Sequence, residues 1–258
     1  TLNYLSQPDF KNSITEYKHF RKIIENTYSL IYELPCKKNI QIDSIYCRDA
    51  SVSTNKGMII CNMGKTERAN EPQHQKQIFK QLGIDILGEI KSPGTLEGGD
   101  VVWLNETTLA VGHTYRTNYE GIEQLHNLLT PLNVNVIVAE MPHYNAPNDV
   151  FHLMSVLSPI DKDLAVIYPR LIPINLRNEL IGRNFKLIDV PDQEFNTMGC
   201  NILALEPRKV LMLDGNPITQ GLMRTAGVEI ITYEGLNISI KGGGGPTCLT
   251  RPIMRERV

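Results

Sequence analysis

Apolar residues recur along this 258-residue chain in short β-type runs and helical stretches, and the same order returns several times. In each repeat, two β-rich runs joined by a turn precede a helix, and another apolar run follows it. The first turn, Asn55-Lys56-Gly57, is a typical hairpin signal. The predicted hairpin strands are Ile45–Val52 with Gly57–Asn62, Asp100–Leu104 with Thr108–Gly112, Val150–Leu157 with Leu164–Tyr168, and Asn201–Leu205 with Lys209–Leu213. The predicted helices and closing strands are Glu71–Leu82 and Asp85–Lys91, a helix from Asn118 and Val134–Glu140, Ile174–Arg183 and Phe185–Val190, and Thr219–Ala226 and Val228–Tyr233.

A fifth unit requires both ends of the chain. Asn237–Ile240 and the segment around Cys248 supply one part, and a strand at Leu2–Leu5 with a helix at Ser13–Tyr32 supplies the other. The period of roughly 50 residues is typical of stacked or propeller-like repeats, whose units bury their sheets only by packing side by side. The pattern therefore predicts an α/β fold of five units around an axis, with hairpins inside and helices outside. A plain α/β sandwich with irregular element order is the alternative.

Composition narrows the class of protein. With 41% hydrophobic and 21% charged residues, and no Pro/Gly/Ser linker, the chain is predicted to form one domain, residues 1–258. A net charge of −2 and the lack of a long apolar run argue against nucleic-acid and membrane partners. A homodimer is compatible with the sequence, which does not fix the oligomeric state. Zinc-type Cys/His spacing is missing, so no metal is expected. The odd cysteine count predicts free thiols in a reducing compartment, the cytoplasm: Cys36, Cys47, Cys61, Cys200 and Cys248.

Chemistry is most strongly indicated near the end of the chain, where Cys248 follows the glycine run 242–245. Glycines let a backbone turn tightly and approach a ligand, and they offer a thiol few side-chain neighbours to pack against. A nucleophilic thiol needs a base, and the base needs an orienting group. Phe151-His152-Leu153 and Glu97-Gly98-Gly99-Asp100 provide candidates for both. The alternative for Cys248 is a buried structural thiol, the usual fate of a cysteine.

Taken together and in this order, the three motifs resemble the guanidine-modifying enzymes of the pentein superfamily. That group contains arginine deiminases, dimethylarginine dimethylaminohydrolases and amidinotransferases, and the overall likeness is to the dimethylarginine dimethylaminohydrolase-like branch. The resemblance implies a five-fold pseudosymmetric β/α-propeller, which agrees with the repeat count. It also implies that Cys248 is the nucleophile, that His152 is the general acid and base, and that Glu97 orients His152. Asp100 is implied either to contact substrate or to stabilise its turn.

Substrate-binding residues follow from the same resemblance. A guanidinium is planar and permanently charged, so it needs carboxylate acceptors. Asp43 and Asp49 match the acids that hold the guanidinium in the dimethylarginine branch, although Arg48-Asp49 looks more like deiminases and amidinotransferases. Arg68 and Arg116 match positions that hold the α-carboxylate of an amino-acid substrate.

The residue two positions after His152 separates the branches. Arginine deiminases typically have an Asp there that clamps the free guanidinium, whereas this chain has Met154. Thioethers are weak acceptors, so this position argues against a standard arginine deiminase.

The resulting interpretation is a cysteine-dependent hydrolase of the guanidino C–N bond of arginine or an ω-methylarginine. It would form citrulline and an amine or ammonia through a covalent thiouronium, with no metal or organic cofactor. An amidinotransferase or an arginine deiminase remains the alternative, because both use the same residue types. A non-catalytic pentein that binds a macromolecule is more remote, because such proteins lack the Cys, His and Glu set.

Overall fold

The computed structural model describes residues 2–28, 30–145 and 151–254 of the chain. It is an α/β fold with four separate three-stranded sheets in the described residues. The hairpin strands are β1 (Ser51–Thr54) with β2 (Gly57–Ile60), β4 (Val101–Trp103) with β5 (Thr108–His113), β7 (Leu157–Asp161) with β8 (Leu164–Ile167), and β10 (Leu203–Glu206) with β11 (Lys209–Leu213). The following helices and third strands are α2 (Glu71–Gln81) and β3 (Ile86–Glu89), α3 (Tyr119–Leu129) and β6 (Asn135–Glu140), α4 (Ile174–Gly182) and β9 (Lys186–Asp189), and α6 (Pro217–Thr225) and β12 (Glu229–Tyr233).

All four sheets share one topology. The first two strands form an antiparallel hairpin, and the third strand pairs in parallel with the second after the helix has crossed over. Parallel neighbours require such a crossover because a tight turn can join only antiparallel strands. The structure therefore confirms the predicted order of hairpin, helix and strand for four units.

Each connection from helix to third strand passes through a residue with a left-handed backbone. Glycine and asparagine adopt this conformation most readily, and they commonly end helices. The residues and their φ angles are Gly83 (70°), Asn133 (57°), Asn184 (64°) and Gly227 (81°). This shared stop signal explains why the predicted ends of the helices lie close to the observed ones.

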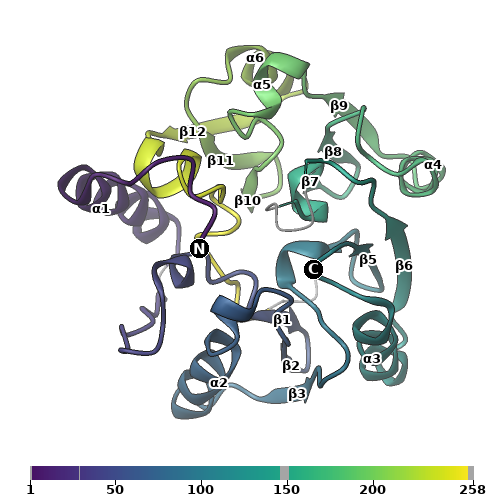
Figure 1. Ribbon diagram of the computed structural model, residues 1–258. Coiled ribbons are helices and arrows are strands. Elements are labelled where there is room, and N and C mark those ends of the chain that lie inside the picture. Colours follow the sequence, from purple (N-terminus) through teal and green to yellow (C-terminus); the bar gives the residue numbers. More distant parts are fainter. Residues whose placement is uncertain (1, 29, 146–150, 255–258) are drawn as a thin grey trace.

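The four units surround a common centre with their helices on the outside, as Figure 1 shows. The remaining sector is occupied by α1 (Phe10–Thr27) and by the C-terminal segment, coloured yellow. In the described part of this sector there is no strand: Leu236–Ile240 is a π-helical turn, and Leu2–Leu5 is not a strand but donates one backbone hydrogen bond, from Leu5 N to Lys241 O (2.8 Å). The predicted strand at Leu2–Leu5 is therefore wrong.

Two other predicted strands start too early. The run from Ile45 is a 3₁₀ turn at Ile42–Ile45 followed by further turns, and the strand begins only at Ser51. In the third unit the strand begins at Leu157, after a 3₁₀ turn at Leu153–Ser155. Val150, which begins the predicted strand there, lies outside the described residues. In both cases the residues assigned to a strand form the turn that carries candidate site residues.

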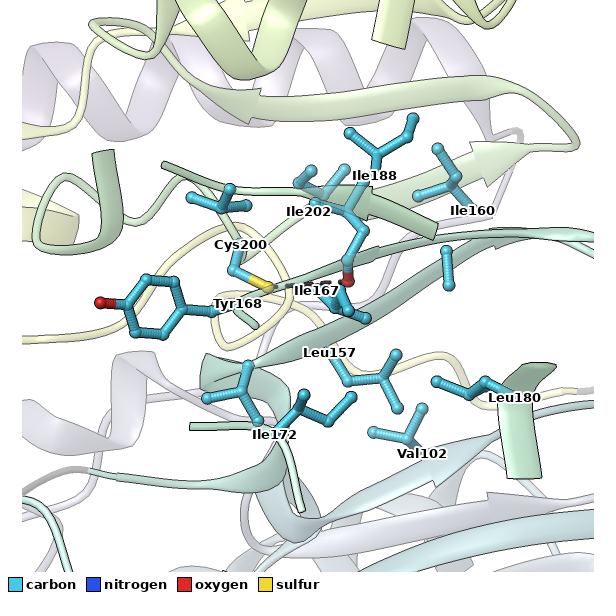
Figure 2. Close-up of a cluster of buried hydrophobic side chains, with 14 of the residues drawn as sticks. Val102, Leu157, Ile160, Ile167, Tyr168, Ile172, Leu180, Ile188, Cys200 and Ile202 are labelled. Carbon is cyan, nitrogen blue, oxygen red and sulfur yellow. Dashed lines mark hydrogen bonds between the residues drawn. The ribbon is translucent and has the colours of Figure 1, made fainter. Parts of the chain in front are cut away.

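The largest buried cluster lies between the second, third and fourth units (Figure 2). Branched aliphatic side chains fill it, including Val102 on β4, Leu157 on β7 and Ile202 just before β10. Cys200 lies among them, and its thiol donates to the carbonyl of Val166 at 3.6 Å. Burial raises the pKa of the Cys200 thiol far above its ordinary value, so this cysteine is a packing residue.

A second cluster joins α1 to the fourth unit and to the cysteine segment. Phe20 and Ile24 from α1 pack in the same cluster as Tyr233, Cys248 and Leu249. Burying a side chain of this size contributes about 1.5–3 kcal/mol, so α1 supplies much of the apolar support for the segment. No helix in the described ranges is long and apolar enough to cross a membrane.

Candidate active site

Six of the eight predicted site residues line one pocket. Its walls come from turns of several units that are far apart in the sequence. Glu97 and Asp100 do not line it and lie fully buried behind it. The lining residues are Asp43, Tyr46, Asp49, Lys65, Arg68, Arg116, His152, Met154, Ser155, Asn201, Gly242, Gly243, Gly244 and Cys248.

The glycine run before Cys248 is needed mainly for close packing. Only Gly243 in this run has a positive φ, at 79°. A Cβ added at Gly242 would come within 1.9 Å of the Tyr46 hydroxyl oxygen, and one at Gly244 within 2.3 Å of the Tyr46 ring. Because Tyr46 Oη also donates to Ile238 O (3.0 Å), the ring is fixed against the loop. Larger residues would displace the loop that presents the thiol.

The thiol of Cys248 is buried but reaches the pocket, with 8% of the residue exposed. Its sulfur accepts a hydrogen bond from Asn201 Nδ2 at 3.6 Å and lies 3.7 Å from Thr247 Oγ1. Burial, together with the negative charge of Asp49, raises the thiol pKa, while the contacts with Thr247 and Asn201 and the charge of Arg48 oppose that rise. The free chain therefore holds Cys248 mainly as the thiol at neutral pH.

His152 lies between two carboxylates. Its Nε2 is 2.9 Å from Glu97 Oε2, and its Nδ1 is 3.9 Å from Asp49 Oδ1. Burial alone would lower the pKa of His152, but Asp100, Asp49 and the hydrogen bond to Glu97 outweigh it and raise the pKa to about 9. Burial would raise the pKa of Glu97, yet His152 and Arg116 lower it to about 2. The pair is thus an imidazolium and a carboxylate at neutral pH.

The Glu-Gly-Gly-Asp turn is shaped by the lack of side chains at its centre. A Cβ at Gly99 would lie 2.5 Å from His152 Nδ1, and one at Gly98 would lie 2.2 Å from Arg48 O. Asp100 is completely buried: Oδ1 accepts from Leu153 N (3.0 Å), and Oδ2 accepts from two threonine hydroxyls. Asp100 thus contacts the turn after His152 and does not line the pocket, and its role in substrate contact or in stabilising its own turn stays a prediction.

Asp43 and Asp49 each pair one carboxylate oxygen with a basic side chain, and the other oxygen of each lacks a hydrogen-bond donor among the described residues. Asp43 Oδ2 pairs with Lys65 Nζ (2.8 Å), and Asp49 Oδ2 pairs with Arg68 Nη1 (2.5 Å). The Oδ1 atoms of both aspartates are buried and accept no hydrogen bond from the part of the chain that the structure describes. An unsatisfied buried acceptor costs about 1–3 kcal/mol, so a ligand that donates to both would recover this energy.

The two predicted arginines differ in how many of their N–H groups already donate hydrogen bonds to described residues of the protein. Arg68 donates from Nε and both Nη atoms to Glu71, to Asp49 and to Tyr46 O, which uses four of its five N–H groups. Its place in the structure is that of a support for Asp49. Within the described residues the Arg116 guanidinium donates from Nη1 alone, to both oxygens of Glu97 (2.9 and 3.1 Å), and Arg116 also lines the pocket.

A metal ion is conceivable at one place in the described residues. Asp49, Glu97 and His152 each offer a ligand atom, and these atoms lie within 4.8 Å of one another. A ligating histidine must be neutral, however, whereas the two carboxylates hold His152 in the charged form. The residues therefore fit an imidazolium better than a metal centre, and the expectation of no metal stays a prediction.

Sequence reasoning gave no role to several residues in and around the site, and three of them make contacts that matter to the predicted residues. Lys65 bonds to Asp43 and its backbone N–H donates to Glu97 Oε1 (3.1 Å). Arg48 donates from Nε to Thr247 O (2.7 Å), so it holds the cysteine segment instead of a ligand. Asn201 contacts the thiol itself. No local sequence motif marks Lys65 or Arg48 as a site residue. Asn201, in contrast, is marked by its position in the repeat of roughly 50 residues.

Solved structures with the same fold include two groups. A dimethylarginine dimethylaminohydrolase, in an adduct with S-methyl-L-thiocitrulline, matches with a TM-score of 0.80 at 21% identity over 95% of this chain and 90% of its own. The N-terminal domain of ArgZ, a cyanobacterial arginine dihydrolase bound to substrate, matches with a TM-score of 0.85 at 16% identity over 96% and 88%. The dimethylarginine dimethylaminohydrolase of Pseudomonas aeruginosa, a Cys-to-Ser mutant with citrulline bound, matches with a TM-score of 0.78 at 21% identity over 95% of this chain and 89% of its own.

Sequence comparison is more specific. The arginine deiminase of Mycoplasma capricolum is 28% identical over 297 residues, which cover 96% of this chain and 72% of that protein. An uncharacterised protein of Aeropyrum pernix is 29% identical over 213 residues, which cover 82% and 73%. The sequence pattern of the arginine deiminase family matches residues 14–181 and 175–255, which together span nearly the whole chain. The predicted kinship with guanidine-modifying enzymes is therefore confirmed, and the chain belongs to the arginine deiminase family.

Proposed function

We propose that this protein is a cysteine-dependent hydrolase of the guanidino C–N bond of arginine or an ω-methylarginine, giving citrulline and ammonia or an amine. The observation that carries the proposal is a pair of buried carboxylate oxygens, Asp43 Oδ1 and Asp49 Oδ1, in the pocket that Cys248 and His152 also line; neither accepts a hydrogen bond from the described residues. A cation with several N–H groups satisfies both oxygens at once. Family membership and the arginine-processing enzymes of the same fold support it.

In the first half of the reaction the substrate activates its own nucleophile. The positive guanidinium next to Cys248 opposes the effects of burial and of Asp49, so the thiol loses its proton to solvent on binding. The thiolate attacks the central guanidino carbon and forms a C–S bond. The imidazolium of His152 donates a proton to the departing nitrogen as the C–N bond breaks. An amine leaves, and a covalent thiouronium remains on Cys248.

In the second half His152 acts as a base. Having given up its proton, it accepts one from a water molecule, and the resulting hydroxide attacks the thiouronium carbon. The C–S bond breaks, its electron pair returns to the sulfur, the hydroxyl proton of the intermediate passes to solvent as the C=O bond forms, and the ureido product leaves. His152 is again an imidazolium beside Glu97, which keeps the ring in place through both halves.

The residue next to the histidine turn favours a methylated substrate. Met154 is half-buried, lines the pocket and packs against the large apolar cluster. N-methyl groups would contact a thioether there, whereas a carboxylate at this position would be left unpaired by them. A plain arginine deiminase activity is the second candidate, and the family membership favours it.

We expect an ω-methylated arginine to be processed at least as well as arginine. The measurement is kcat/KM for arginine and for dimethylarginine on one enzyme preparation, with citrulline and the released amine both quantified. Met154→Asp should shift the preference toward arginine, because the new carboxylate clamps an unmethylated nitrogen. If wild type prefers arginine by more than about a hundredfold, roughly 2.7 kcal/mol in transition-state binding, deiminase activity is the better account.

The α-carboxylate of the substrate is assigned to Arg116. Arg116→Ala should raise KM for an amino-acid substrate by roughly tenfold or more, since a charge-assisted contact contributes about 1.5–3 kcal/mol. A guanidine without the carboxylate, such as agmatine, serves as the matched substrate and should be affected little. Equal losses on both substrates would show that Arg116 acts only by holding Glu97.

The same proposal extends to the architecture and setting of the enzyme. The four sheet-bearing units and the sector of α1 and the cysteine segment support a five-fold propeller that forms a single catalytic domain, residues 1–258. The free thiols of the described chain support a reducing compartment, the cytoplasm.

A further inference from the structure

Asn201 makes contacts in the pocket that no role has yet explained. Its Oδ1 accepts from the backbone N–H of Thr247 (3.2 Å) and from Thr247 Oγ1 (2.9 Å). Its Nδ2 donates to Cys248 Sγ at 3.6 Å. One side chain thus contacts both the loop that carries the nucleophile and the sulfur itself.

The orientation of this amide follows from its partners. A backbone N–H can only donate, so the atom that faces Thr247 N must be the oxygen. The nitrogen then faces the sulfur and must donate to it. Gly245 allows this approach, because a Cβ there would lie 2.4 Å from Asn201 Oδ1.

The backbone on both sides of Asn201 is held by one hydroxyl. Ser158 Oγ, from β7 of the neighbouring unit, donates to Cys200 O (2.7 Å) and accepts from Ile202 N (3.1 Å). Asn201 N itself donates to Met198 O (3.0 Å). The amide is therefore fixed to the third and fourth units before it contacts the cysteine segment.

We propose that Asn201 is a catalytic residue of this site, which positions the nucleophile loop through its oxygen and stabilises the reacting sulfur as a thiolate through its N–H. The inference rests on the proposed nucleophilic role of Cys248. Hydrogen bonds to a charged form favour that form and are stronger than neutral ones. The neutral amide does so without adding a charge that would compete with a cationic substrate.

Other groups also act on the same sulfur, and the test must separate them from Asn201. Asp49 disfavours the thiolate, and Arg48 favours it. The hydroxyls of Tyr46 and Tyr233 lie close enough to interact with it electrostatically, and His152 lines the same pocket. None of these groups is altered by a substitution at residue 201.

The experiment is the rate of iodoacetamide alkylation at Cys248 between pH 6 and 10, without substrate, quantified by peptide mass spectrometry. Asn201→Asp keeps the size and the acceptor but replaces the donor with a negative charge. We expect the inflection to rise by about one pH unit or more and the rate at neutral pH to fall roughly tenfold. Asn175→Asp, the same change at an exposed position in the first turn of α4, is the matched control and should leave the profile unchanged.

Asn201→Ala removes the donor without adding charge, and it carries the test if the Asp variant does not fold. Its inflection should also rise, by a smaller amount. A profile that overlays the wild-type profile in a folded Asn201 variant, with only Tm lowered, would overturn the proposal and leave Asn201 a purely structural residue. Because the assay needs no substrate, it is independent of turnover: an active Cys248→Ser enzyme would refute the proposed function instead.

Discussion

Cys248→Ser should lose at least about a thousandfold in turnover while it keeps the wild-type fold. The serine hydroxyl is smaller than the thiol and fits the same position against Asn201 and Thr247. Its pKa is so much higher than that of a thiol that a neighbouring guanidinium cannot ionise it. The measurement is citrulline formation under saturating substrate, with circular dichroism and Tm to establish folding.

Two matched cysteine variants complete this experiment. Cys36 is exposed, and Cys47 is half-buried next to Arg48 in the turns behind the pocket. Cys36→Ser and Cys47→Ser should retain activity within about twofold, since neither thiol lines the pocket. Turnover in Cys248→Ser close to the wild-type rate would refute the assignment of Cys248 as the nucleophile. If only Cys47→Ser lost activity, Cys47 would be the nucleophile instead.

His152→Ala should slow the departure of the amine and, more strongly, the hydrolysis of the covalent intermediate that follows. Without an imidazole no group is placed to take a proton from water, so hydrolysis of the thiouronium should slow by about a hundredfold or more. Acid-quenched mass spectra should then show an adduct on Cys248 that accumulates during incubation with substrate. Wild-type enzyme quenched in the same way should show far less.

Histidines elsewhere in the chain provide the control for this variant. Neither His113 nor His126 is among the described residues that line the pocket, and His113 pairs with Glu140 at the surface (2.8 Å). Neither His113→Ala nor His126→Ala should accumulate an adduct or lose activity. The reverse pattern, with an inactive His113 or His126 variant and an active His152 variant, would assign the proton transfers to another residue.

Period and turn chemistry were enough to predict four of the units. Hairpin turns, left-handed residues after the helices and apolar runs are local features, so the sequence displays them directly. The start of the first unit could not be read in this way. The run from Ile45 to Val52 has β-type composition, but the side chain of Tyr46 packs against Gly242 and Gly244, which lie nearly 200 positions later in the chain. That distant contact turns the segment, and the strand begins only at Ser51.

The sequence predicts a candidate site residue where a motif marks it. It does not predict which side chains that residue pairs with. A motif marks Asp49, but only the fold reveals its ion pair with Arg68. From the sequence, Arg68 is expected to hold the carboxylate of a ligand. Asn201 could have been found from the repeat itself. Asp49, Asp100, His152, Asn201 and Cys248 follow one another at intervals of 51, 52, 49 and 47 residues. A polar residue at the start of each unit is therefore a signal of the site, and a search for local motifs alone does not find it.

The sector of α1 and the cysteine segment constrains when this protein can become active. Glu16 on α1 accepts hydrogen bonds from the backbone N–H groups of Asn237 and Ile238, and Leu5 N donates to Lys241 O. These contacts join residues more than 200 positions apart, so they need both ends of the chain, and we expect them to form late in folding. During synthesis, the first partner emerges long before the second. A nascent or truncated chain can complete its four sheets and still lack a positioned thiol, so an activity assay would report finished molecules only.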